Sequence, residues 1–219
     1  MAVKAVRYME ENNKKSRPKR QQQRGPKPPK RLSERYLDNS SLGYLQRFPS
    51  SINHFRDVMH QKIKRSCRHH TDQDPAPFMA YVEKLVERYT TLGLLDDTLY
   101  AKALVNSLRR RGASKRQIEQ KTGQKGLDDD TLKHAIEQAD EEFETETDAE
   151  IHAALRLAKR KRLGPFARPG TRPADDDGTH ADHNRALAAM GRAGFSYNIS
   201  KKVLEMTSDD VMALGFTVL

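Results

Sequence analysis

The stretch Leu108-Arg-Arg-Arg-Gly-Ala-Ser114 carries the signals of a tight corner between two helices. Cations at the end of a helix suit the negative end of its dipole. Gly112 can end that helix, and Ser114 can cap the next one. The same order of an apolar residue, Arg, Pro or Gly, and Ser occurs at 45–51 and 190–196. Three similar corners predict a repeated helical unit.

A second pattern, Gly followed by aspartates, occurs at 92–97 and 125–130. Gly93 and Gly126 can end one helix, and the aspartates after them can cap the next. Together with the corners, these marks divide the chain into units of three short helices.

Between these marks, apolar residues recur at helical spacing on one face. One such stripe consists of Phe78, Val82, Leu85, Tyr89 and Leu92. A second stripe runs from Leu37 to Phe48, with Ser41 as its polar interruption, and similar stripes follow to residue 206. No stretch alternates as a strand would, so we predict an all-α protein.

We predict three-helix repeats at 32–94, 95–144 and 145–207, followed by a C-terminal segment at 208–219. One helix with four or five apolar residues is too short to be stable alone, so the helices must pack within and between units. The larger spacing to the third corner is attributed to residues 163–183, with three prolines and three glycines, which we predict to be a mobile insert.

The amino-terminal segment 1–31 holds 11 Lys or Arg against two Glu, whereas the remaining chain is almost neutral. Residues 10–31 contain four prolines and no large apolar side chain. Such a segment buries too little to offset its conformational entropy, so we predict a disordered basic tail. Two roles are open for it: an arm attracted to nucleic acid, or a solubilising extension.

Several classes of protein are not expected. Cys67 is the only cysteine, which precludes an intramolecular disulfide and fits a reducing compartment. No apolar run approaches about 20 residues, and no secretory signal is visible. We therefore expect a cytoplasmic protein with no membrane partner.

Catalytic and metal sites are also not expected. The chain has no phosphate-binding glycine loop, nucleophile elbow or His-Glu zinc motif, so we predict no catalytic residues, no cofactor and no enzyme activity. Cys67, His69 and His70 form one group of potential metal ligands, and His180 and His183 near the aspartates at 175–177 form another. A structural zinc site needs four ligands at set spacings, usually with several Cys, and neither group is complete in this sense, so we predict no metal.

Two groups of cations are the best candidates for binding. They comprise Arg109, Arg110, Arg111, Lys115 and Arg116 around the central corner, and Lys159, Arg160, Lys161 and Arg162 at the end of a later helix. One interpretation is that each cation only complements a helix terminus. The other is that the groups contact phosphates or an acidic protein surface.

Acidic residues are concentrated just before the second basic group. Residues 128–150 hold eleven acids against Lys133, and 156–172 hold seven cations and no acid. We favour neutralisation between adjacent helices over a dipolar surface that orients the protein in a groove.

The segments that carry these marks resemble the RecX family of RecA regulators. Residues 93–101, 108–112 and 125–127, with Ile118, resemble that family's central repeat. Residues 190–197 resemble its C-terminal repeat, and 160–164 resemble the basic segment before it. The resemblance implies an elongated, curved array of three-helix repeats without a catalytic site.

The resemblance also implies a function. RecX-like proteins bind the filament of RecA recombinase on single-stranded DNA and inhibit its ATP hydrolysis and strand exchange. We therefore expect a monomer whose partners are RecA filaments and single-stranded DNA, with double-stranded DNA as a further candidate. The alternative is a direct DNA-binding protein that uses its units as helix-turn-helix modules. Sequence-dependent binding to duplex DNA without RecA would favour that alternative.

Overall fold

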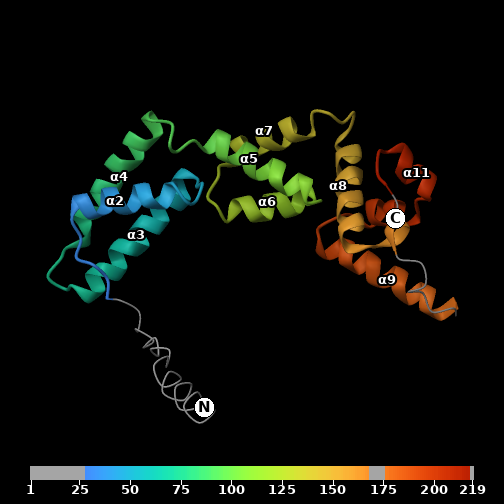
Figure 1. The fold of residues 1–219 in the computed structure, drawn as a ribbon, viewed down its shortest axis with the longest axis horizontal. Coiled ribbons are helices and arrows are strands. Elements are labelled where there is room, and N and C mark those ends of the chain that lie inside the picture. The colour runs from blue at the N-terminus through green and yellow to red at the C-terminus, as the bar shows by residue number, and fades with distance from the viewer. Residues whose placement is uncertain (1–27, 168–175, 218–219) are drawn as a thin grey trace, which may run out of the picture.

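The computed structural model describes residues 28–167 and 176–217. These residues form helices and no strand, which confirms the predicted all-α class (Figure 1). The helices are α2 Glu34–Leu45, α3 Ile52–His69, α4 Pro75–Thr91, α5 Asp97–Arg110, α6 Lys115–Gly123, α7 Asp129–Asp140, α8 Glu146–Lys161, the 3₁₀ turn η1 Gly164–Phe166, α9 Asp176–Arg192, α10 Tyr197–Glu205 and α11 Ser208–Ala213.

The helices form three groups, each around its own apolar core. We call them unit 1 (α2–α4, around Phe55 and Met59), unit 2 (α5–α7, around Val105 and Ile118), and unit 3 (α8–α11 with η1, around Met190). Figure 1 shows the three units following one another in an arched row, with unit 2 in the middle. The structure is therefore an elongated array of small bundles.

Local signals explain where most of these helices begin and end. Ser51, Ser114 and Ser196 accept hydrogen bonds from the backbone N–H three residues on, as predicted for caps. Asp96 and Asp128 cap α5 and α7 in the same way. The corner glycines Gly112 and Gly194 have positive φ, a conformation that favours glycine, and so do Gly93 and Gly126 of the second pattern.

The polar interruption in the first stripe is part of the core. Ser41 is fully buried, and its hydroxyl lies 2.7 Å from the hydroxyl of buried Tyr89. The last residue of each of two predicted stripes does not join the core, because α2 and α4 end before that residue is reached. Phe48 and Leu92 are 53% and 64% exposed.

The prediction of a mobile insert at 163–183 is wrong at both of the ends that the structure describes. Gly164–Phe166 forms η1 with Phe166 buried in the core of unit 3, and α9 already begins at Asp176. As a result, the third corner follows the second helix of its unit, whereas the first two corners follow the first helix. The C-terminal segment also joins unit 3, because Val211 of α11 is buried there.

The prediction of a disordered tail over residues 1–31 is wrong at its C-terminal end. Residues 1–27 lie outside the described part of the chain, but the next four residues are held against α3. Ser66 donates a hydrogen bond of 2.8 Å to the Lys30 carbonyl, and His70 donates one of 3.0 Å to the Pro29 carbonyl. Arg31 forms an ion pair with Asp72.

Among the described helices, none is both long and apolar enough to cross a bilayer.

Candidate functional site

The units are joined by hydrogen bonds at the start of α3. The Ser51 hydroxyl, which caps α3, donates to the Lys125 carbonyl of unit 2. The Ile52 N–H donates to Oδ1 of Asp97 at 2.8 Å, and the Asn53 side chain donates to the Gly126 carbonyl at 2.7 Å. The amino-terminal end of α3 is therefore occupied by unit 2.

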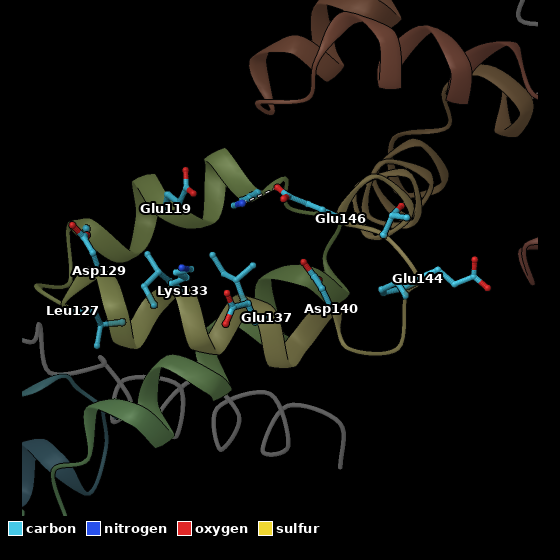
Figure 2. A pocket seen from close by; sticks show the side chains of 14 residues that line it. Glu119, Leu127, Asp129, Lys133, Glu137, Asp140, Glu144 and Glu146 are labelled. Atoms are coloured by element: carbon cyan, nitrogen blue, oxygen red, sulfur yellow. Dashed lines mark hydrogen bonds and ion pairs between the residues drawn. The ribbon is translucent and has the colours of Figure 1, made fainter.

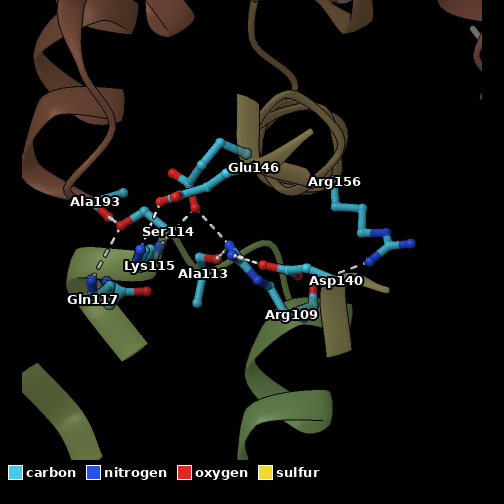
Figure 3. Close-up of polar contacts among 10 residues, drawn as sticks. Arg109, Ala113, Ser114, Lys115, Gln117, Asp140, Glu146, Arg156 and Ala193 are labelled. Carbon is cyan, nitrogen blue, oxygen red and sulfur yellow. Dashed lines mark hydrogen bonds and ion pairs between the residues drawn. The ribbon is translucent and has the colours of Figure 1, made fainter. Parts of the chain in front are cut away.

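The joint between units 2 and 3 repeats this arrangement at the start of α6. The Ser114 hydroxyl donates to the Ala193 carbonyl at 2.7 Å, and the Lys115 N–H donates to Oε1 of Glu150 at 2.7 Å (Figure 3). In both joints the capping serine holds a carbonyl of the next unit, and the residue after it holds a carboxylate. A carboxylate suits the positive end of a helix dipole. The corner motif thus serves two purposes, because it turns the chain and couples the units.

Arg109 does not lie on a binding surface, and its assignment to one is corrected here. The residue is 4% exposed, and its guanidinium donates to Glu150 at 2.6 Å, Asp140 at 2.5 Å and the Ala113 carbonyl at 3.1 Å (Figure 3). Burial alone would lower the pKa of Arg109, but the hydrogen bonds to Asp140 and Glu150 outweigh it and raise the pKa. Arg109 is therefore a charged internal tie between units 2 and 3.

Lys115 is engaged in the same joint. Its ammonium forms an ion pair of 2.7 Å with Glu146, and that hydrogen bond raises the pKa of Lys115. The acidic run is thus partly neutralised by cations that precede it, Arg109 and Lys115. The cations that follow the run, at 156–162, form no ion pair within the described residues.

The other predicted cations are exposed, and the joint brings them near one another. Gly112 lies so close to α8 that a Cβ there would be 2.5 Å from the Leu157 nitrogen. Arg110 and Arg111 precede this contact, and residues 159–162 follow Leu157 on α8. These six cations and Arg116 are exposed and form no ion pair within the described residues.

A further cation was missed by the sequence analysis. Arg116 and Arg192 line a polar hollow of about 170 Å³ between the start of α6 and the corner that follows α9. Gln117, Gln120 and Gly194 line it too. Arg192 occupies the Arg position of the third corner, as Arg110 does in the second, so the repeat could have identified it. Two guanidinium groups beside one polar hollow can bind an oxyanion such as a phosphate.

We call the exposed cations around this joint the basic surface. It comprises Arg110, Arg111, Arg116, Lys159, Arg160, Lys161, Arg162 and Arg192. Lysine and arginine side chains can bind phosphates or an acidic protein surface through electrostatic contacts. The described residues contain no cluster of three or more metal-ligating side chains. The exposed cations of the basic surface support the binding of an anionic partner.

A row of small helical bundles, coupled by hydrogen bonds and surrounded by cations at one joint, defines an all-helical repeat protein. Comparison with known proteins specifies which kind. The family model for the second three-helix domain of RecX matches residues 96–136, nearly all of unit 2. Together with the relatives that match most of its length, this match shows that the chain belongs to the RecX family.

Relatives support this membership along most of the chain. The chain is 36% identical over 189 residues to the regulatory protein RecX of Myxococcus xanthus strain DK1622, covering 86% of this chain and 94% of that protein. It is 30% identical over 172 residues to regulatory protein RecX of Agrobacterium fabrum, covering 78% and 83%. A third regulatory protein RecX, from Thermobifida fusca, is 23% identical over 124 residues.

Proposed function

We propose that this protein is a non-enzymatic regulator that acts in the cytoplasm as a monomer. It binds the RecA filament on single-stranded DNA and inhibits ATP hydrolysis and strand exchange. The observation that carries the proposal is the basic surface at the joint of units 2 and 3. A RecA filament on DNA presents both an acidic protein surface and the phosphates of the DNA. An elongated array can contact such a filament at several points.

The exposure of these cations supports partner binding over a purely internal role. Arg109 and Lys115 show what the internal role looks like, since both are paired with acids across the joint. The basic surface has no such partners in the described residues. Lys159, Arg160 and Lys161 also complement the negative end of α8, but that role leaves their charged groups free in solvent.

The alternative, direct binding to duplex DNA by helix-turn-helix units, is less well supported by the geometry of the joints. In such modules the start of the second helix contacts base edges in the major groove. The corresponding ends of α3 and α6 are covered by the next unit. At the third corner, the start of α10 carries Tyr197, which is 65% exposed.

The test is RecA-coupled ATP hydrolysis and strand exchange on single-stranded DNA, with and without stoichiometric protein. We expect inhibition by the native chain and at least about tenfold weaker inhibition by the double variant Arg110→Glu and Arg111→Glu, because reversed charges repel phosphates and acidic groups. The matched control is Lys64→Glu with Arg65→Glu, an adjacent exposed pair on α3 in unit 1. The control should inhibit almost as well as the native chain.

Two outcomes would contradict the proposal. If the native chain has no effect on RecA at stoichiometric concentration, the regulatory role is wrong. If the Arg110 and Arg111 variant inhibits fully, the basic surface is not the contact. Sequence-dependent binding of the native chain to duplex DNA without RecA would instead favour the alternative.

A further inference from the structure

Unit 2 contains a groove that the proposed function does not use. It lies between α6 and α7, has a volume of about 760 Å³, and ends at the α7–α8 connection (Figure 2). Its apolar part is formed by Leu127, Leu132, Ile136 and Phe143. A hollow of this size with an apolar base can hold several side chains of a peptide.

The rim of this groove is acidic. Six carboxylates line it against two lysines, Lys115 and Lys133. The acids are Glu119, Asp129, Glu137, Asp140, Glu144 and Glu146, of which all but Asp140 are exposed. Glu119, Asp129 and Glu144 form no ion pair within the described residues. The groove therefore matches a segment that combines apolar side chains with cations.

The amino-terminal segment 1–27 of the same chain has this composition. It holds nine Lys or Arg against Glu10 and Glu11. Its first nine residues, Met-Ala-Val-Lys-Ala-Val-Arg-Tyr-Met9, place Val3, Val6 and Met9 among cations. Apolar side chains are thus available for the base of the groove and cations for its rim.

The chain is also long enough to reach the groove. Pro29 and Lys30 are fixed to the C-terminal end of α3, and Asn53 at its other end contacts Gly126, beside Leu127 of the groove. The 18 residues of α3 span about 27 Å. The roughly 20 residues between Met9 and Pro29 can span about 65 Å when extended.

We propose that residues 1–27 bind in the acidic groove of unit 2 of their own chain. Val3, Val6 and Met9 lie on the apolar base, and the lysines and arginines lie along the rim. The groove thereby holds cations that would otherwise be free to attract nucleic acid, so its occupancy sets how much of the tail is available to phosphates.

Zero-length carbodiimide crosslinking of the full-length chain tests the proposal, because the reagent joins a lysine amine only to a carboxylate that it touches. The crosslinked pairs are identified by mass spectrometry. We expect Lys4, Lys14, Lys15 and Lys19 to couple to Glu119, Asp129 or Glu144. Glu87 and Glu205, exposed acids in units 1 and 3, serve as controls. They should couple at least about tenfold less than the groove acids, since an isolated ion pair at a protein surface is weak.

A charge-neutral variant separates docking from mere attraction. Changing Val3, Val6 and Met9 to Ser keeps every charge, and it should lower the groove crosslinks at least about fivefold because apolar burial is lost. A 1:1 mixture of ¹⁵N-labelled and unlabelled chains shows which chain supplies the tail. Crosslinks spread evenly over groove and control acids, an unchanged yield in the serine variant, or crosslinks only between differently labelled chains would each overturn the proposal.

Discussion

Arg109 in unit 2 holds Glu150 in unit 3, with 2.6 Å between Nη1 and Oε1, and both side chains are buried. The same Oε1 accepts the Lys115 N–H at the start of α6. One carboxylate of α8 therefore accepts hydrogen bonds from a side chain in the last turn of α5 and from the first N–H of α6. It ties both helices of unit 2 to unit 3.

Replacing Arg109 by Leu should destabilise the protein by about 3–5 kcal/mol, because it leaves the carboxylates of Asp140 and Glu150 without their cation. Urea unfolding monitored by circular dichroism measures the change. Arg111→Leu, on the exposed side of the same corner, should stay within about 0.5 kcal/mol of the native chain. Equal stability of the two variants would show that Arg109 is not a tie between the units.

Ser114→Ala should remove a helix cap and an inter-unit hydrogen bond in one step. A cap is worth about 1 kcal/mol, and an unsatisfied buried carbonyl at Ala193 costs about 1–3 kcal/mol more. Ser33→Ala is the matched control, since Ser33 caps α2 through the Tyr36 N–H and lies on the surface. Free energies of unfolding of the two variants should differ by more than the error of the urea titration. If they agree, the bond to Ala193 contributes nothing to stability.

Gly112→Ala should be far more harmful than Gly93→Ala. Both residues have positive φ, so both variants carry a backbone strain of about 1–2 kcal/mol. Only at position 112 would the new Cβ meet another helix, at 2.7 Å from the Ala153 carbonyl, whereas position 93 is open. Crowding of this kind adds about 1–3 kcal/mol.

Small-angle scattering complements the unfolding measurement for the two glycine variants. Separation of units 2 and 3 should increase the radius of gyration of the Gly112 variant and leave that of the Gly93 variant at the native value. Identical stability and dimensions for both variants would mean that the close approach to α8 is not needed.

Stability should fall on acidification, and His54 should account for part of the loss. Burial and, after it, the nearby Lys125 ammonium lower the pKa of His54 in the folded chain. The unfolded chain then binds the proton more readily, so stability is full above the usual histidine pKa of about 6.5 and declines as the pH falls below it. Unfolding in urea at pH values of about 7.5 and about 5.5 measures the decline. His54→Gln should lose less stability between these two values than the native chain, and an equal loss would refute the assignment.

Features that depend on neighbouring residues could be predicted from the sequence. The capping serines, the aspartates at 96 and 128 and the glycines with positive φ all lie within one turn of the break they produce. Their physics is local. The all-α class followed from these signals and from the apolar spacing.

Features that depend on distant residues could not be predicted in this way. Arg109 looks like its neighbours Arg110 and Arg111 in the sequence, and only the approach of Asp140 and Glu150 makes it internal. The proline- and glycine-rich composition of 163–183 concealed the start of α9. Ser41 interrupts an apolar stripe in the sequence, and its burial could not be predicted because its hydrogen-bond partner, Tyr89, lies on another helix.

The joints also give the array a direction. At each of them the capping serine belongs to the earlier unit, and the accepting carbonyl and carboxylate belong to the later one. The two ends of the row of units are therefore chemically different. A partner that is itself polar, as a single strand with a 5′ and a 3′ end is, would meet this protein differently in its two possible senses, and only one sense can give the better fit.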